Sequence, residues 1–207
     1  MEKEKLFGKT LHELQEICTR LQLPSFAARQ MAEWLYQSNV NSIEGMTNIS
    51  LKNRNILAEH FQFGVTPSSK VQESVDGTKK YLFPTSNNRF IEAAYIPETD
   101  RATLCVSSQI GCKMGCLFCM TGKQGFQGNL SAGEILNQVK SLPEQKMLTN
   151  IVYMGMGEPL DNTEEVLKSL EIFTSAWGFG MSPKRITVST IGIIPSLDTF
   201  LNRSDCH

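Results

Sequence analysis

Apolar residues recur every three or four positions over the first sixty residues, which is the spacing of one buried helix face. The first stripe consists of Leu11, Leu14, Cys18 and Leu21. Pro24 follows it, and two further stripes lie between residues 27 and 57. Large apolar side chains such as Met31 and Trp34 are expected in a core. The pattern predicts a small helical domain over residues 1–65.

The spacing changes to that of β-strands after this region. Two runs, Lys70 to Val75 and Thr78 to Phe83, flank Asp76-Gly77. This dipeptide is typical of a tight hairpin turn. Another strand is expected from Arg89 to Ile96. Residues 66–97 are therefore predicted to form a β-hairpin linker.

Strand and helix patterns alternate after residue 98. The expected strands are Ala102 to Ser107, Asn150 to Met154 and Arg185 to Thr190, and the expected helices are Ser131 to Lys140, Thr163 to Ala176 and Ile194 to Leu201. Such alternation indicates an α/β fold with a parallel sheet and helices outside it. Three strand–helix units cannot close a barrel. We expect an incomplete barrel over residues 98–207, in a chain that is part of a longer protein or needs a second half.

Composition excludes some classes of protein and leaves others open. No run approaches the roughly 18 apolar residues of a membrane span, and the charged start, Met1 to Lys5, is unlike a signal peptide. A cytoplasmic protein without membrane contact is expected. A net charge of −1 gives no overall sign of nucleic-acid binding. Six cysteines without export features favour metal binding or catalysis over disulfides.

Three of these cysteines, Cys112, Cys116 and Cys119, form a C-x3-C-x2-C pattern in one short loop. Three thiolates can hold a [4Fe–4S] cluster and leave one iron open, where S-adenosylmethionine can chelate. Zinc is an alternative, but it needs a fourth ligand, for which only Cys206 and His207 are late candidates. Three unrelated buried thiols are a second alternative.

Two other segments follow predicted parallel strands. The carboxyl ends of these strands should lie at the same edge of the sheet as the cysteine loop, here called the rim. Gly155 to Pro159 follows the second strand, where glycines expose carbonyl groups and Glu158 adds a carboxylate suited to a ligand ammonium. Ser189 lies near the end of the third strand, and its hydroxyl can bond a carboxylate or ribose. Each signal is weak alone, because glycine turns and packed serines are common. Their value comes from sharing a rim with the cysteine loop.

Taken together, these motifs resemble a known family. The cysteine loop is similar to that of the radical S-adenosylmethionine superfamily. Longer runs resemble the RlmN/Cfr family of adenosine C2/C8 RNA methyltransferases over nearly the whole chain. These runs are Arg101 to Cys112, Gly125-Phe126, Asn129-Leu130, Gly155 to Pro159 and Thr187 to Thr190.

The resemblance implies a partial (βα)6 barrel with a helical accessory domain that contacts RNA. It implies that the cluster ligands are Cys112, Cys116 and Cys119. It implies that S-adenosylmethionine is bound by Gly157, Glu158 and Ser189. It also implies that Glu92 is the proton acceptor and that Cys105 is the thiol that helps resolve the covalent enzyme–RNA intermediate. A disulfide bond is also implied. From residue chemistry alone, Glu92 is a carboxylate on a strand and Cys105 a buried thiol.

The implied reaction uses two S-adenosylmethionine molecules, one to methylate an enzyme cysteine and one to generate a radical. The expected target is C2 of adenosine in large-subunit ribosomal RNA and some transfer RNAs. The expected partners are these RNAs and an electron donor such as flavodoxin or ferredoxin, and the chain is expected to be a monomer. Open alternatives are a C8-specific relative, another radical activity, and a non-enzymatic metal- or RNA-binding remnant.

The chain also departs from the family pattern. No position matches the methyl-carrying cysteine, because Cys206 is followed by a single residue. We therefore expect that these 207 residues alone do not methylate RNA.

Overall fold

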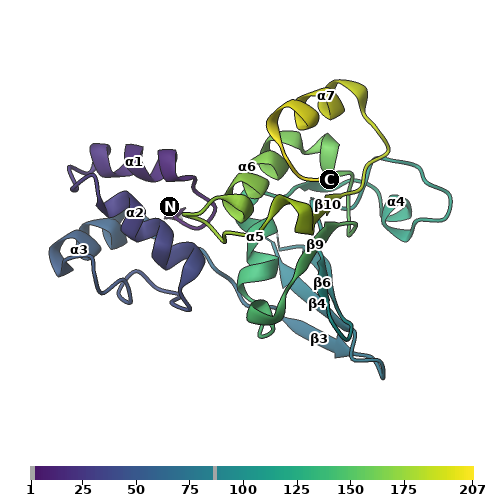
Figure 1. Ribbon diagram of the computed structural model, residues 1–207, viewed down its shortest axis with the longest axis horizontal. Helices are drawn as coiled ribbons and strands as arrows, with labels where there is room; N and C mark the ends of the chain where they lie inside the picture. The colour runs from purple at the N-terminus through teal and green to yellow at the C-terminus, as the bar shows by residue number, and fades with distance from the viewer. Residues whose placement is uncertain (1–2, 86–87) are drawn as a thin grey trace. The chain divides into compact units, whose positions relative to one another are not determined.

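The computed structural model describes residues 3–85 and 88–207, which form two compact units (Figure 1). Unit 1 comprises Met1–Val65 and Glu171–Met181, and unit 2 comprises Thr66–Leu170 and Ser182–His207. The three-domain division by residues 1–65, 66–97 and 98–207 stays a prediction. Residues 1–2 of its first domain and 86–87 of its second lie outside the described residues.

Unit 1 contains the helices that the apolar stripes predict. These elements are α1 (Leu11–Arg20), α2 (Ala27–Ala32), the π-helical η1 (Glu33–Gln37) and α3 (Leu51–His60), with β1 (Glu4–Lys5) pairing in parallel with β2 (Phe61–Gln62). Thr10 begins α1 with a capping box, in which its hydroxyl accepts from Glu13 N and its N–H donates to Glu13 Oε2. Met31 is buried as expected, but Trp34 is only half buried, and its indole N–H donates to Asn48 Oδ1.

An aromatic cluster forms part of the core of unit 1. The ring of Tyr36 lies 5.5–6.0 Å from those of Phe7, Trp177 and Phe179. The Tyr36 hydroxyl donates to the carbonyl of Lys9, which satisfies its polar end. Two of the four rings come from residues 171–181, so this distant segment completes the unit.

Unit 2 is built on a six-stranded sheet with the order β10-β9-β6-β5-β4-β3. Its strands are β3 (Lys70–Glu73), β4 (Lys79–Pro84), β5 (Phe90–Pro97), β6 (Ala102–Cys105), β9 (Asn150–Tyr153) and β10 (Ile186–Val188). The predicted parallel arrangement is confirmed for β6, β9 and β10, whereas β3 to β6 form an antiparallel meander. The predicted hairpin strands therefore join the same sheet. Within the described residues the sheet keeps two ends, as in a partial barrel.

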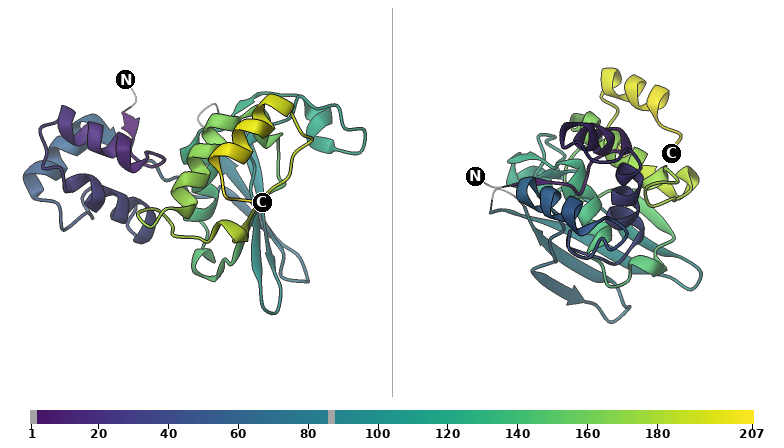
Figure 2. Two further views of the ribbon diagram at one scale, coloured as in Figure 1. Left: turned by 45° about the horizontal axis from the view of Figure 1, so that its top comes forward. Right: turned by 90° about the vertical axis from the view of Figure 1, so that its left-hand side faces the viewer.

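Helices cover one face of this sheet. Figures 1 and 2 show α5 (Ala132–Lys140) and α6 (Thr163–Thr174) against it, and Ala132 N donates to Glu165 Oε2 at 2.6 Å between them. Tyr153 on β9 reaches α6, where its hydroxyl lies 2.6 Å from Ser169 Oγ. The predicted capping box of Ser131 begins α5. The next helix, α7 (Ile194–Arg203), follows β10.

Several short elements have no counterpart in the predicted pattern. They are β7 (Gln109–Ile110), α4 (Met120–Gln124), β8 (Gly128–Asn129), η2 (Gln145–Met147), η3 (Pro159–Asp161) and η4 (Pro183–Arg185). β7 and β8 pair in a small sheet on either side of the cysteine loop and α4. Among the helices described, none has the length and apolar character needed to cross a bilayer.

Candidate active site

The uncovered face of the six-stranded sheet, here called the open face, brings two predicted catalytic residues together. Paired residues of a β-ladder project to the same face. Ala94 pairs with Cys105, and Glu92 lies two residues before Ala94 on β5, so Glu92 and Cys105 share this face. Cys105 also pairs with Val152 on β9. The alternating neighbours, such as Leu104, are buried on the other face.

Glu92 is exposed on the open face. Its carboxylate Oε2 lies 3.3 Å from Lys80 Nζ on the adjacent strand, and both side chains are about half exposed. The backbone carbonyl of Glu92 accepts a 2.6 Å hydrogen bond from Ser107 Oγ. The strand is thus fixed at this position while the carboxylate stays accessible.

Cys105 ends β6 beside the end of β9. Burial raises the pKa of its thiol, and a backbone hydrogen bond with Met154 opposes that rise only in part. The thiol is therefore protonated near neutral pH.

The three cysteines of the predicted cluster lie in the loop between β7 and α4. Cys112 is buried, while Cys116 and Cys119 are half buried. Met114 N approaches Cys112 Sγ at 3.4 Å, and a backbone hydrogen bond from Gly122 lowers the pKa of the Cys119 thiol. Both contacts place N–H groups against sulfur, which stabilises a thiolate.

Glycine allows this loop to fold back tightly. At Gly111 the backbone has φ +72°, and a Cβ atom there would lie 1.8 Å from the carbonyl oxygen of Gly125. A Cβ at Gly122 would lie 2.7 Å from the carbonyl oxygen of Met114. Side chains at these positions would force the loop open, so its shape depends on both glycines.

The donor set of this loop fits an iron–sulfur cluster. Throughout residues 3–85 and 88–207, no three His, Cys, Asp or Glu side chains are grouped so as to hold one metal ion. A cubane is different, because each cysteine binds a different iron and the sulfurs need not converge on one ion. Three free thiols within one loop match that requirement, and the ligand assignment stays a prediction.

The disulfide bond implied by the family resemblance is wrong for this structure. All six cysteines are free within the described chain. The reason is their placement on separate elements: Cys18 is buried in α1, Cys105 ends β6, and Cys206 follows α7. The other three lie in the cysteine loop.

Glu158 connects the ends of β9 and β10. It is only 4% exposed, and its Oε1 accepts from Leu160 N at 3.0 Å and from the Thr190 hydroxyl. Its Oε2 accepts from Ile191 N at 3.0 Å. Ser189, next to Thr190, is exposed, and its N–H reaches the carbonyl of Tyr153 at 3.4 Å.

Gly157 brings the turn after β9 against the start of the cysteine loop. Its φ is +99°, and a Cβ atom would lie 2.5 Å from Gln109 Cβ. The backbone N–H of Gln109 also donates to the carbonyl of Met156 at 3.1 Å. The predicted cofactor residues and the cysteine loop therefore meet at the same end of the sheet.

Sequence reasoning missed three residues of this region: Gln109, Asp161 and Thr190. Gln109 is fully buried and Thr190 bonds the carboxylate of Glu158. The run from Cys105 to Cys112 has no periodicity that marks a buried amide. Thr190 was visible only as a neighbour of Ser189.

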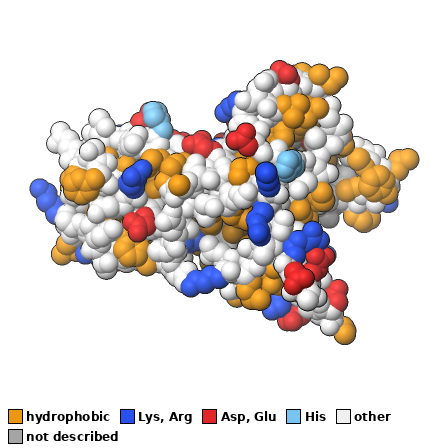
Figure 3. Space-filling view, viewed as in Figure 1, with side chains coloured by type: hydrophobic (Ala, Val, Ile, Leu, Met, Phe, Trp, Pro, Cys, Tyr) orange, Lys and Arg blue, Asp and Glu red, His pale blue; other side chains and the backbone are white. Residues whose placement is uncertain are grey.

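The loop of the three cysteines also carries exposed apolar side chains. Leu117 and Phe118 are 91% and 92% exposed, and Met120 is exposed as well. Figure 3 shows apolar side chains gathered over α4. The Lys113 ammonium lies 4.4 Å from the ring centre of Phe126, so one cation covers part of this apolar surface.

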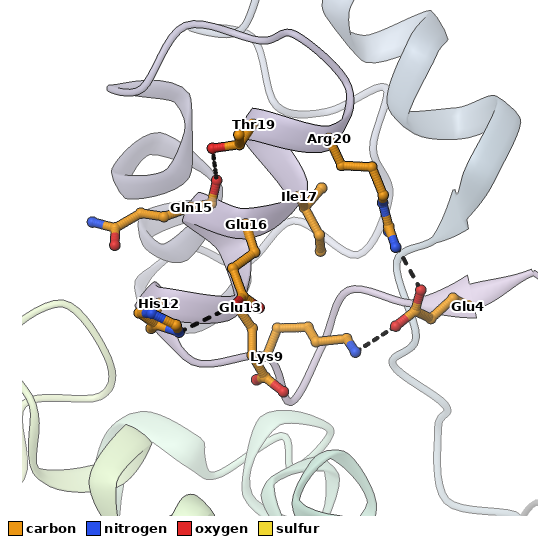
Figure 4. Close-up of a pocket in the computed structure, with 9 residues that line it drawn as sticks. All are labelled: Glu4, Lys9, His12, Glu13, Gln15, Glu16, Ile17, Thr19 and Arg20. Atoms are coloured by element: carbon orange, nitrogen blue, oxygen red, sulfur yellow. Dashed lines mark hydrogen bonds and ion pairs between the residues drawn. The ribbon is translucent and has the colours of Figure 1, made fainter.

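A separate hollow of about 660 Å³ lies along α1 in unit 1 (Figure 4). Lys9 and Arg20 both pair with Glu4, and His12 lies 3.8 Å from Glu16. Because its cations face carboxylates, this hollow presents no cluster of one charge sign.

Comparison with family models identifies the class of protein. Residues 106–203 match the model of the radical SAM superfamily, which covers the cysteine loop and the ends of β9 and β10. Residues 4–63 match the model of the ribosomal RNA large subunit methyltransferase N-terminal domain. The chain is a radical SAM protein with an N-terminal domain of this methyltransferase type.

The chain belongs to the RlmN family. It is 59% identical over 205 residues to the probable dual-specificity RNA methyltransferase RlmN of Phocaeicola vulgatus, covering 99% of this chain and 59% of the relative. It is 42% identical over 197 residues to the dual-specificity RNA methyltransferase RlmN of Geotalea uraniireducens, covering 95% of this chain and 57% of that relative. The chain thus spans less than two thirds of their length.

A solved structure has the same fold. The crystal structure of a radical SAM methyltransferase from Sphaerobacter thermophilus superposes with a TM-score of 0.89 and 36% sequence identity. The match covers 99% of this chain and 61% of that one. The predicted radical SAM fold class is confirmed.

Proposed function

We propose that this chain forms the cluster- and S-adenosylmethionine-binding part of an RNA methyltransferase. The proposed target is C2 of adenosine in large-subunit ribosomal RNA and some transfer RNAs. One observation carries the proposal: the loop with three free thiols meets the Gly155–Pro159 turn at the end of the sheet whose open face holds Glu92 and Cys105. The names of the relatives, which print RNA methyltransferase, support the substrate class.

In this proposal Cys112, Cys116 and Cys119 hold a [4Fe–4S] cluster. When bound, the cluster supplies the electron for reductive cleavage of S-adenosylmethionine. Gly157 lets the turn after β9 lie flat against Gln109, and Ser189 offers an exposed hydroxyl to the cofactor.

The proposed role of Glu158 follows from its buried contacts. Because both carboxylate oxygens already accept hydrogen bonds, Glu158 binds the cofactor by shaping its surroundings and by its negative charge. A cofactor ammonium at the exposed Gly155 turn would be attracted to that charge.

The open face supplies the other proposed roles. Glu92 is accessible and acts as the proton acceptor, with the Lys80 ammonium beside it. Cys105 carries a protonated thiol and acts in resolving the covalent enzyme–RNA intermediate. The proposed setting is a cytoplasmic monomer that receives electrons from a flavodoxin or ferredoxin. A C8-specific activity uses the same residues and is separated by product analysis.

Anaerobic reconstitution of the 207-residue chain tests the proposal. We expect about four irons per chain and formation of 5′-deoxyadenosine from S-adenosylmethionine under reducing conditions. Cys116→Ala should abolish both. Cys18→Ala is the matched control, because Cys18 is buried in α1, and this variant should retain both.

Three outcomes of that experiment are informative. Zinc bound without iron would contradict the radical activity and favour a non-enzymatic metal-binding role. Iron without cofactor cleavage would contradict the cofactor assignment. Liquid chromatography of the nucleosides from RNA added to the reaction, run against authentic standards and read by mass spectrometry, separates the isomers C2-methyladenosine and C8-methyladenosine. It also tests the expectation that this chain alone makes neither.

A further inference from the structure

A buried side-chain amide joins the cysteine loop to the turn after β9. Gln109 is 0% exposed, and its Nε2 donates to Asn129 Oδ1 at 2.8 Å and to Asp161 Oδ2 at 2.7 Å. Its Oε1 accepts from Glu158 N at 2.9 Å. One side chain therefore contacts β8, η3 and the start of the Glu158 segment.

The chemistry of the partners fixes the orientation of this amide. The Asp161 carboxylate only accepts when ionised, and the Glu158 backbone N–H only donates. Both hydrogens of Gln109 Nε2 are used, and the reverse orientation would place a donor against a donor and an acceptor against an acceptor. The amide is thus held in one direction by groups from different segments.

Asp161 extends the connection to the cysteine loop itself. Its Oδ2 lies 2.8 Å from Lys113 Nζ, and its Oδ1 lies 3.1 Å from the same nitrogen. Lys113 follows Cys112 directly in the chain. A chain of contacts therefore runs from Cys112, the first predicted cluster ligand, to Glu158. It passes through Lys113, Asp161 and Gln109.

We propose that Gln109, acting with Asp161, is a positioning residue that holds the cysteine loop in register with the Gly155–Pro159 turn. A ligand bound by both segments is then oriented by this polar connection. The inference rests on the proposed function only for the identity of that ligand, because the contacts belong to the protein itself. Gly157 adds to the same packing, since any Cβ there would collide with Gln109.

The polarity of the connection can be reversed without changing its shape. Gln109→Glu replaces both amide hydrogens by an acceptor oxygen that faces the carboxylate of Asp161. Adding Asp161→Asn restores a donor opposite that oxygen, while Glu158 N can still donate to the other carboxylate oxygen. The third partner, Asn129, is exposed, so its side-chain amide can turn by 180° and present its NH₂ group to the new carboxylate. A residue that only fills space would show no such rescue.

Hydrogen exchange of the cofactor-free chain, read by mass spectrometry, tests the proposal. We expect Gln109→Glu to speed exchange about tenfold in residues 111–124 and 155–162, because a buried donor–acceptor pair is lost. The double variant should return to within about threefold of the original rate. Gln138→Glu is the matched control: Gln138 is also 0% exposed, but it bonds both backbone groups of Ser107, so Asp161→Asn should not rescue it.

The outcomes separate this proposal from the proposed function. Equal behaviour of Gln109→Glu and the double variant overturns the positioning role. A single variant that fails to fold while the double variant folds supports it. After reconstitution, the S-adenosylmethionine-dependent change in the cluster's electron paramagnetic resonance spectrum should need about tenfold more cofactor in Gln109→Glu and recover in the double variant. If the unaltered chain shows no such spectral change, the proposed function is contradicted. The hydrogen-exchange comparison still tests whether Gln109 and Asp161 hold the two segments together.

Discussion

Glu158 is a buried carboxylate whose two oxygens accept three hydrogen bonds from the ends of neighbouring segments. The donors are Leu160 N, the Thr190 hydroxyl and Ile191 N. Burying a charged group is costly unless such donors compensate for lost water. At the scale of the residue, Glu158 therefore acts as a structural clamp in addition to its proposed electrostatic role.

Replacing this carboxylate by its amide isostere should destabilise unit 2. In Glu158→Gln one acceptor oxygen becomes an NH₂ group, which leaves a donor facing a donor. We expect a loss of about 1–3 kcal/mol in the free energy of unfolding, measured by urea denaturation. Glu164→Gln is the control, because Glu164 is exposed and pairs with Arg203 at the surface. It should cost less than about 1 kcal/mol. Equal losses for the two variants would disprove the clamp.

Lys140 gives a second prediction at the residue scale, through pH. Burial lowers its pKa from 10.5 to about 8, so the folded chain releases this proton before the unfolded chain does. Between these two values the unfolded state binds more protons, and stability must rise with pH. We expect the free energy of unfolding to rise by about 1–3 kcal/mol from pH 8 to pH 10.5 through this group.

The variant Lys140→Met should remove that part of the pH dependence. It replaces the buried ammonium by an uncharged side chain of similar length. Urea denaturation of the unaltered chain and of Lys140→Met from pH 8 to pH 10.5 measures how the free energy of unfolding of each depends on pH. All other titrating groups are the same in both chains, so the difference reports Lys140. Parallel curves for the two chains would contradict the assignment to Lys140.

The elements of the fold differ in how far local sequence specifies them. The hairpin is specified by its turn, in which Gly77 has φ +81° and Asp76 Oδ1 accepts from Thr78 N at 3.0 Å. The start of α5 is specified by Ser131 and Glu134. By contrast, α4, β7 and β8 are too short to show a period, and their positions depend on contacts with distant residues. This is why the sequence predicted the cysteine loop but not the small sheet that flanks it.

The two capping boxes lead to a prediction at the scale of the element. Ser131 caps α5 in unit 2, and Thr10 caps α1 in unit 1 with the same pair of hydrogen bonds. Ser131→Ala should weaken α5 by about 1 kcal/mol, and Thr10→Ala should weaken α1 by a similar amount. Hydrogen exchange should accelerate about fivefold in the affected helix alone. Each variant serves as the control for the other. Faster hydrogen exchange in the helix whose cap is unchanged would contradict a local effect of capping.

For the molecule as a whole, sequence periodicity predicted the class of fold but not how distant segments combine. The alternation after residue 98 correctly indicated parallel strands with helices outside. Nothing local showed that β5 and β6 would pair, or that residues 171–181 would join unit 1 through Trp177 and Phe179. Candidate site residues could be proposed from sequence where the chemistry of a side chain marks them, as at Cys112, whose role as a cluster ligand stays a prediction. It was not predictable at Gln109, because a buried amide is defined by its partners.

The order of strands in the sheet also has a consequence for how the chain assembles during synthesis. β3, β4, β5 and β6 are consecutive along the chain and pair with their sequence neighbours, whereas β9 and β10 add to β6 after a long connection. Short-range pairings close with less loss of chain entropy, so we expect the meander to form before β9 and β10 have been synthesised. On this order of folding, Glu92 and Cys105 are positioned first, and β9 and β10, which lead into the proposed cofactor-binding residues, add to β6 afterwards.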